Sequence, residues 1–577
     1  MNGFKFRVYA SLLVFVCCGS IHAQGGYAMF HDGQTDYVIS VGEDATEAEQ
    51  AAATVLQDYL FEISKARFPV VAASTDKAIT LDIPKGDKEK DFLKNSDSFS
   101  IVSDGAIIHI SGANEKSLLY AVYAFLEESF GCRWYTSDVK EIPKRDNFSF
   151  SKINITEASP ISFRSVDYID VWDPAMAIPN RNNCQFHGPQ KTPFIDMLWL
   201  EHSFDVFVPT SQYFETHPEY YSYHDGKRHD KRNQLCLSNK EVMEITIRQL
   251  RQYIKDHPEF KIYNVAQNDN QNYCRCDECS KLARKYGGES GIMIWFVNQV
   301  ADAVRDEFPD KYIGTFAYQY TRQPPKNIEP RDNVAIILCT IECDFSHPFT
   351  HKNNKKFLED LDNWKEITTN ILIWDYVVNY RHYFLPHPNF DILQENIQIL
   401  RDAGVLGILE QANGQSRGSE FFGLRSYLLT KLLWDPDCNA RAVIEDYIGN
   451  YYGSSSPYIL EYFDLVQSLV GSDTFLSFST KATNPVFTSK FIKKADALFD
   501  KAEKAASADD VILRRVELAR LQITYLKLVT DLVDCDKEQL LKEFIEITSR
   551  EGIEWSSEGL RVSGFVEKFN SMNSDGI

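Results

Sequence analysis

Apolar and polar positions in residues 26–150 follow the pattern of a small α/β domain. Short apolar runs typical of strands alternate there with two longer segments in which apolar residues recur at helical spacing. In the first of these segments Ala52, Leu56, Tyr59 and Leu60 fall on one stripe. The pattern therefore predicts a sheet with helices packed on it.

From residue 160 to residue 435 the pattern changes to short apolar strands that alternate with amphipathic helices and polar loops. Eight segments fit strands: ISFRSVDYI, DMLWLEHSF, QLCLSN, KIYNVAQND, YIGTFAYQY, NVAIILCTIECD, NILIWDYVV and GVLGILEQAN. This alternation predicts a (β/α)8 TIM barrel. In such barrels the active groups cluster at the carboxyl ends of the strands, so polar residues there carry the most functional weight.

Residues 436–577 have helical periodicity, no strand pattern and no obvious chemistry. We expect a helical domain that packs on the barrel. The predicted fold class is therefore α/β, with a central barrel between a small N-terminal α/β domain and a C-terminal helical domain.

The first 23 residues have the features of a secretory signal peptide. Lys5 and Arg7 precede an apolar run from Val8 to Cys18, and the small residue Ala23 comes before the expected cleavage point. The run is too short to span a membrane. We expect an exported protein, periplasmic or extracellular and not inserted in the membrane after cleavage; the periplasm is favoured because no lipoprotein cleavage pattern precedes the two cysteines at the end of the run.

The chain is acidic. Its formal charge of −21 becomes −23 without the signal peptide, which holds two basic and no acidic residues. An acidic surface repels nucleic acid and anionic lipid, so neither is expected as a partner.

Four predicted barrel strands end in acids: Asp269, Glu342, Asp375 and Glu410. A single acid of this kind is equally compatible with a capping or salt-bridged role, but buried acids without partners are costly, so four at one barrel mouth indicate a shared function. Cleavage of a glycosidic bond needs one carboxylic acid at the leaving oxygen and a second group that attacks, activates water or orients an assisting acetamide. The acids therefore predict a glycoside hydrolase.

Aromatic residues accompany these acids. Trp374 and Tyr376 flank Asp375, and Tyr318 and Tyr320 close the fifth predicted strand. Aromatic faces beside acids suit a pyranose ring, although Trp374 fits barrel packing equally well. A long polar and aromatic segment follows DMLWL, and we interpret it as a substrate-facing loop with His202 as its best candidate, a structural histidine being the alternative.

Cys274, Cys276 and Cys279 form a compact motif directly after Asp269. They could bind zinc with a fourth thiolate from elsewhere, such as Cys236 or Cys343; they could form a disulfide; or they could remain free. A cysteine nucleophile is disfavoured because the motif holds no histidine.

Several other signatures are absent from the sequence. No HExxH pair indicates a catalytic metal, and the glycine-rich nucleotide loops and the GxSxG elbow are missing. We therefore expect carboxylate chemistry without a cofactor.

Several segments together resemble known families. LLYAVYAFLEESFGCRWYTSD resembles the end of the small domain that precedes the barrel in family 20 hexosaminidases and α-glucuronidases. THPEYYSYHDGKR, NVAQNDNQNYCRCDEC, LCTIECDFSHP, ILIWDYVVNY and LRSYLLTKLLWDPD resemble the bacterial domain of unknown function 4838 family, over nearly the whole mature chain. Some members of that family are classed as glycoside hydrolase family 163, endo-β-N-acetylglucosaminidases of complex N-glycans. The resemblance implies a secreted enzyme of the kind found in gut Bacteroidetes, with an oligosaccharide or glycoprotein glycan as its partner.

The resemblance also implies roles for individual residues. With an N-acetylglucosaminide, the substrate acetamide attacks the anomeric carbon and configuration is retained, so Glu342 becomes the general acid/base and Asp269, beside Asn268, the acetamide partner. Family 20 enzymes have an Asp-Glu pair after the fourth strand, where this sequence has Asn268-Asp269. The further candidates for sugar contact are His202, Tyr318, Trp374, Asp375, Tyr376 and Glu410.

Two alternatives stay open. In an inverting scheme like that of α-glucuronidases, Asp375 or Glu410 activates water, and Arg164 or Arg381 binds the uronate. In the other, the barrel binds glycans without turning them over.

Overall fold

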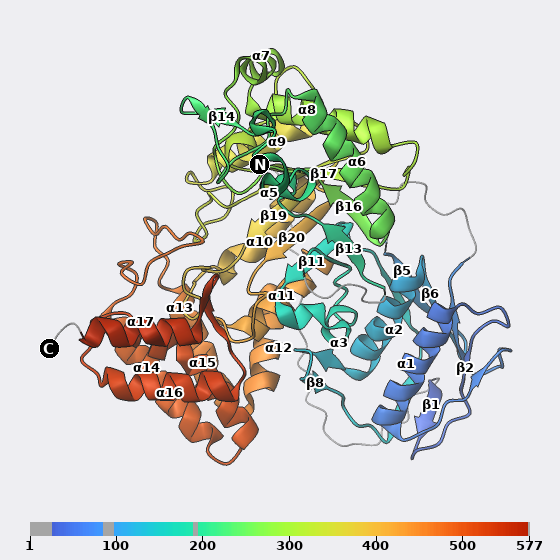
Figure 1. The fold of residues 1–577 in the computed structure, drawn as a ribbon. Helices are drawn as coiled ribbons and strands as arrows, with labels where there is room; N and C mark the ends of the chain where they lie inside the picture. The colour runs from blue at the N-terminus through green and yellow to red at the C-terminus, as the bar shows by residue number, and fades with distance from the viewer. Residues whose placement is uncertain (1–25, 85–96, 188–193, 575–577) are drawn as a thin grey trace, which may run out of the picture.

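The computed structural model describes residues 26–84, 97–187 and 194–574. The predicted signal peptide lies outside the described residues. Three regions follow one another along the chain: a blue N-terminal α/β region, a central barrel and an orange-red group of C-terminal helices (Figure 1).

The N-terminal region is a six-stranded sheet with two helices packed on it. Helix α1 (Glu47–Ser64) begins at a capping box between Thr46 and Glu49, and α2 (Glu115–Phe130) begins at Asn114. The strand order is β10-β5-β6-β4-β2-β3, with bounds β2 (Val38–Ser40), β3 (Val70–Val71), β4 (Ala78–Asp82), β5 (Phe99–Asp104), β6 (Ile107–Gly112) and β10 (Asn154–Glu157). A separate pair joins β1 (Tyr27–His31) to β9 (Asn147–Phe150), and a second joins β7 (Arg133–Trp134) to β8 (Lys140–Glu141). The α1 and α2 helices lie side by side (Figure 1).

The centre of the molecule is an eight-stranded parallel sheet that nearly closes into a barrel. Around the barrel the strands are β11 (Phe163–Asp167), β12 (Cys184–Gln185), β13 (Asp196–Trp199), β16 (Phe260–Asn264), β17 (Tyr312–Ala317), β18 (Val334–Cys339), β19 (Ile371–Tyr376) and β20 (Gly407–Gln411). Strand β20 pairs with β11, and the Asn183 N–H donates to the Arg164 carbonyl at 3.1 Å across the remaining seam. The predicted TIM barrel is confirmed.

Helices cover the barrel unevenly. They are α3 (Pro174–Ala177), α4 (Phe204–Phe207), α5 (Thr210–Tyr213), α6 (Lys240–Asp256), α7 (Asp277–Tyr286), α8 (Glu289–Val304), α9 (Lys355–Lys365), α10 (Phe390–Asp402) and α11 (Phe422–Trp434). Within the described ranges, β12 leads to β13 without a helix, and only the short η4 (Gln319–Thr321) lies between β17 and β18. The η2 (Ile169–Trp172) and η3 (Pro218–Tyr220) turns and the β14 (Tyr223–His224) and β15 (Lys227–Arg228) hairpin complete this region.

One predicted barrel strand is wrong. In QLCLSN, Leu235 forms only an isolated bridge with Tyr221, and the apolar residues are buried because the long loop folds back over them. The true second strand is β12, whose two residues, Cys184 and Gln185, are too short and polar to give an apolar run. The sequence analysis thus missed β12 and added QLCLSN, so the number of strands before KIYNVAQND is unchanged and this segment is the fourth strand, as predicted.

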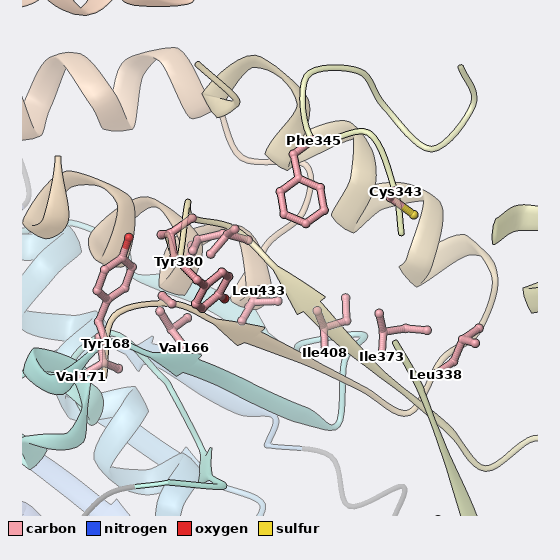
Figure 2. Packing of buried hydrophobic residues seen from close by; sticks show 14 of the residues in the cluster. Val166, Tyr168, Val171, Leu338, Cys343, Phe345, Ile373, Tyr380, Ile408 and Leu433 are labelled. Atoms are coloured by element: carbon pink, nitrogen blue, oxygen red, sulfur yellow. The ribbon is translucent and has the colours of Figure 1, made fainter. Parts of the chain in front are cut away.

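The barrel strands present different residues to the interior and to the helices. Leu372, Trp374 and Leu409 belong to the interior cluster, whereas Ile373 and Ile408 belong to the core between strands and helices. Figure 2 shows Ile408 and Ile373 on adjacent strands, where they are register partners. This alternation decides which strand-end side chains can reach the barrel mouth.

The C-terminal region is mainly helical. Its helices are α12 (Ala440–Tyr452), α13 (Ser456–Gln467), α14 (Ser489–Ala506), α15 (Asp510–Leu528), α16 (Lys537–Arg550) and α17 (Val562–Ser574), with η5 (Gly453–Ser455) between the first two. Contrary to the sequence expectation it contains strands, the hairpin β21 (Trp555–Ser557) and β22 (Leu560–Arg561). These strands are too short to produce a period-two pattern. Among residues 26–84, 97–187 and 194–574, no helix combines the length and apolar character needed to cross a membrane.

Candidate active site

A cavity of about 770 Å³ opens at the carboxyl ends of the barrel strands. Its volume is in the range of small-molecule sites. Acidic, amide and aromatic side chains line it together, including Glu201, Asp269, Glu558, His187, His202, Arg232, Asn270, Gln411, Phe316, Tyr318, Trp374, Tyr376, Tyr380 and Phe478. Of the nine site residues predicted from the sequence, the cavity contains His202, Asp269, Tyr318, Trp374 and Tyr376.

Asp269 lies five residues beyond the end of β16 and is exposed to the cavity. The Tyr318 hydroxyl donates to its Oδ1 atom at 3.1 Å, and the Gln319 amide donates to the same atom at 3.2 Å. Burial and the nearby Asp269 charge raise the pKa of Tyr318, so this phenol stays protonated as a donor. Asp269 is thus held in place through Oδ1, and within the part of the chain that the structure describes its Oδ2 atom accepts no hydrogen bond.

Aromatic rings form much of the cavity wall. Trp374 and Tyr376 both point into the barrel from β19, and Phe316 stands edge-on to Trp374 with ring centroids 5.6 Å apart. The Trp374 indole N–H donates to Gln411 at 2.7 Å, which fixes the ring. Tyr320, also considered from the sequence, does not line this cavity; it lines the adjoining hollow of Glu342 and packs in a tilted arrangement against Tyr273.

Two histidines line the cavity. His202 is oriented by a 2.5 Å hydrogen bond between its Nδ1 atom and the Gln267 carbonyl. His187, which sequence reasoning missed, makes a 2.8 Å contact from Nδ1 to buried Asp167 at the end of β11. Burial opposes protonation of His187, but the charges of Asp167, Glu201 and Glu558 raise its pKa overall. Asp167 ends β11 and Glu201 comes two residues after β13, so the strand-end criterion could have found them.

The C-terminal region also contributes to the cavity. Glu558 lies at the tip of the β21–β22 hairpin, next to Gly559 with φ 96°, a conformation that favours glycine. The Glu558 N–H donates to the Tyr380 carbonyl at 2.8 Å, and the backbone N–H of Tyr380 donates to the Phe478 carbonyl at 2.8 Å. Burial and the charge of Asp269 raise the pKa of Glu558. No pattern in the tail predicted this acid.

Glu342 and Asn268 lie in two hollows that adjoin the central cavity. Glu342 forms an ion pair with Arg322, which also binds Asp360 at 2.9 Å. Their hollow, of about 540 Å³, shares Gln319 with the central cavity, and burial raises the pKa of its Glu289 to about 7.

The second hollow measures about 620 Å³ and shares Arg232 and Asn270 with the central cavity. It is lined by Asn268 and by the long loop after β13, and whether this loop faces a substrate stays a prediction. Asn268 itself is engaged with backbone, donating to the Asn233 carbonyl at 3.0 Å and accepting from the Asp205 N–H at 3.2 Å.

Asp375 and Glu410 do not reach the cavity. They are register partners on β19 and β20, almost fully buried on the helix-facing side of the strands. The Thr340 hydroxyl and the Tyr376 N–H donate to Asp375, and burial together with the Asp375 charge raises the pKa of Glu410. The expectation that four strand-end acids converge therefore fails for this pair, because Trp374, Tyr376 and Gln411 occupy the inward positions.

The arginines considered for a uronate are also away from the cavity. Arg164 is fully buried and binds Asp97 of the N-terminal region at 2.7 Å. Arg381 is exposed after β19 and does not line the cavity. The Arg164 pair instead joins the barrel to the N-terminal sheet.

The fold can now be compared with those of known proteins. The chain has the barrel fold of glycoside hydrolases. It is similar to a family 115 4-O-methyl-α-glucuronidase with specificity for decorated arabinogalactans (TM-score 0.59, 10% identity, 92% of this chain and 78% of the other). It is also similar to a family 89 glycoside hydrolase of Clostridium perfringens, studied in complex with its substrate GlcNAc-α-1,4-galactose (TM-score 0.52, 12% identity, 88% of this chain and 65% of the other).

The family itself is identified by sequence. The family model for the domain of unknown function (DUF4838) matches residues 134–464, more than half of the chain, so the protein belongs to that family. The match includes the whole barrel and leaves the β21–β22 hairpin outside it. No curated protein matches the sequence.

Proposed function

We propose that this protein is an exported glycoside hydrolase that cleaves N-acetylglucosamine-containing glycans by an acetamide-assisted, retaining mechanism. The observation that carries the proposal is the Asp269–Tyr318 pair in an aromatic-walled cavity at the carboxyl end of the fourth barrel strand. A carboxylate and a phenolic hydroxyl side by side match the two polar ends of an acetamide.

In this proposal Asp269 accepts a hydrogen bond from the acetamide N–H. The Tyr318 hydroxyl turns from Asp269 to the acetamide oxygen and holds it near the anomeric carbon. As the glycosidic C–O bond breaks, the acetamide oxygen bonds to the anomeric carbon, and Asp269 stabilises the positive charge that develops on the nitrogen. Water then attacks the anomeric carbon and the bond from this carbon to the acetamide oxygen breaks, with net retention. The proton of the water passes to the carboxylate that protonated the leaving oxygen.

The leaving oxygen needs a proton donor, and we assign this role to Glu558. It lines the same cavity as Asp269, and its raised pKa favours the protonated form that a general acid needs. Glu342, the donor expected from the sequence, is paired with Arg322 in the adjoining hollow. It remains the alternative donor that the experiment below compares.

The shape of the barrel mouth supports endo action. Three hollows adjoin through shared lining residues, Arg232 and Asn270 for one pair of hollows and Gln319 for the other pair. Sugar units bound in the adjoining hollows would extend beyond a bond that is cleaved in the central cavity. The α-glucuronidase-like scheme has less support, because its water-activating acids and its arginines lie outside the cavity.

The test is turnover of a complex N-glycoprotein, an aryl β-N-acetylglucosaminide and an aryl α-glucuronide, with products identified by mass. Wild type is compared with Asp269→Asn, Glu558→Gln and Glu342→Gln. We expect released glycans from wild type, with losses of roughly 100-fold or more for the Asp269 and Glu558 variants. Glu342→Gln is expected to retain most of the activity.

Other outcomes would change specific parts of the proposal. Loss in Glu342→Gln and not in Glu558→Gln would move the donor role to Glu342. Full activity of Asp269→Asn, or release of glucuronic acid alone, would reject the acetamide-assisted mechanism. Glycan binding by wild type without any turnover would identify a non-catalytic barrel.

A further inference from the structure

The three cysteines of the compact motif and a fourth from earlier in the chain meet beside the barrel mouth. Cys236 precedes α6, while Cys274, Cys276 and Cys279 lie at the start of α7. All four are free thiols, and their sulfur atoms lie within 4.8 Å of one another. Three of the side chains are buried and Cys276 is half-buried. Cys343, which the sequence left equally open as a partner, is not in this cluster.

The sulfur separations are those of a metal site and not of a disulfide. The Cys236 sulfur lies 3.7 Å from the sulfur of Cys276 and 3.7 Å from that of Cys279. A disulfide would require about 2.05 Å. Four thiolates arranged tetrahedrally around zinc, each with a Zn–S bond of about 2.3 Å, lie about 3.8 Å apart.

The groups around the sulfurs suit thiolates. The Tyr223 N–H donates to Cys274 at 3.3 Å, and the Arg228 guanidinium donates to the same sulfur at 3.5 Å. The Ser238 hydroxyl lies 3.1 Å from the Cys279 sulfur. Four thiolates and one Zn²⁺ carry a net charge of −2, which the positive charge of Arg228 partly offsets. Outer partners of this kind orient ligands and lower the cost of the negative charge.

We propose that Cys236, Cys274, Cys276 and Cys279 bind one structural zinc ion. The four thiolates complete a tetrahedral shell and leave no open position for water or substrate. None of the four cysteines lines the central cavity. The ion therefore takes no part in bond cleavage, and the proposal does not depend on the reaction that the cavity performs.

The position of the cluster indicates what the zinc would stabilise. It joins the segment after β13, which carries Arg232, to the loop after β16, which carries Asp269 and Asn270. In Figure 1 the β14 hairpin and α7 lie at the same end of the molecule, and the Arg275 N–H donates to the Tyr223 carbonyl at 2.7 Å between them. Gln234, two residues before Cys236, donates to the Asn270 carbonyl at 2.7 Å. Zinc would fix both loops of the cavity rim.

The first experiment measures metal content of the mature chain, purified with thiols reduced and without chelator, by inductively coupled plasma mass spectrometry. We expect one zinc per chain in wild type. Cys236→Ser and Cys279→Ser should lose it to background, and the matched control Cys343→Ala, at a buried thiol outside the cluster, should keep one zinc per chain.

A second measurement on wild type alone covers the case in which the serine variants fail to fold. Replacement of the metal by Co²⁺ should give the sulfur-to-cobalt charge-transfer bands and the d–d bands of a tetrahedral thiolate site. Wild type that contains no zinc and takes up neither zinc nor cobalt after reduction would overturn the proposal. A disulfide among the four cysteines would also overturn the proposal. It would be detected as cluster cysteines that an alkylating reagent fails to label in the unfolded chain unless a reductant is added.

Discussion

Two groups of carboxyl side chains near the same barrel strand ends have opposite environments. Asp269 and Glu558 face the open cavity, whereas Asp375 and Glu410 lie almost fully buried between strands and helices. Both groups include an acid with a raised pKa, but the neighbouring charge differs. Burial and the charge of Asp269 raise the pKa of Glu558, whereas burial and the charge of Asp375 raise that of Glu410. A perturbed carboxyl group therefore indicates a catalytic role only when a substrate can reach it.

The buried pair has its own structural role. Glu410 with a raised pKa holds a proton that it can share with Asp375, while Thr340 and Tyr376 donate to Asp375. The pair thus avoids two adjacent buried charges, and its hydrogen-bond donors serve Asp375. We expect this pair to stabilise the packing of β19 and β20 without contacting sugar.

Replacing an aspartate by asparagine in the cavity and in the buried pair should distinguish the catalytic role from the structural role most strongly. Asp269→Asn is expected to lower turnover roughly 100-fold or more, because the amide no longer stabilises positive charge on the acetamide. Its melting temperature should match wild type. Asp375→Asn should keep the turnover of the folded enzyme but melt at a lower temperature, since its carboxylate accepts two buried donors. Equal loss of turnover per folded molecule in both variants would contradict the comparison.

Removal of the buried partner should cost stability. Glu410→Ala leaves Asp375 buried without its proton-sharing neighbour, and we expect a loss of about 3 kcal/mol in the free energy of unfolding. Chemical denaturation followed by circular dichroism measures it. Glu201→Ala, at an exposed acid of the cavity, is the control and should change stability by less than about 0.5 kcal/mol. If Glu410→Ala were as stable as this control, the proposed structural role of the buried pair would be wrong.

The buried pair should also make stability depend on pH. Because the pKa of Glu410 is raised in the folded protein, the native state keeps a proton that the unfolded chain releases above about pH 4.3. The stabilisation is fully present below that pH and is lost as the pH rises toward the folded-state pKa, by up to about 1.4 kcal/mol per pH unit. Relative to Glu410→Gln, wild type should therefore lose melting temperature from pH 5 to pH 8. Parallel curves for the two proteins would show that Glu410 does not titrate in this way.

The smallest expected effect concerns the hydroxyl that holds Asp269. Tyr318→Phe removes the donor to Asp269 and to the acetamide oxygen, and turnover should fall about tenfold, the equivalent of one charged hydrogen bond. Tyr383→Phe is the matched control, since Tyr383 donates to Gln415 at 3.0 Å outside the cavity. Turnover is measured on an aryl N-acetylglucosaminide. Unchanged turnover in Tyr318→Phe would show that Tyr318 takes no part in catalysis.

Several site residues could be predicted because they follow strands with a clear apolar pattern. Asp269, Tyr318 and Trp374 were found in this way. The same alternation also shows why Asp375 and Glu410 were misplaced: Trp374 and Tyr376 both face inward, so the residue between them must face outward. Applied to β11, the rule places Asp167 inside with Phe163, and Asp167 does orient His187 in the cavity.

The sequence by itself determined the barrel, the helical tail and the aromatic, acidic character of the mouth, because periodicity and strand-end chemistry are local properties. Only the tertiary structure decided that Glu558 enters the cavity from a hairpin beyond β20, and that Cys236 and not Cys343 joins the cysteine motif. Both are contacts between segments far apart in the chain. No local pattern encodes such contacts; the packing of the loops around the barrel produces them.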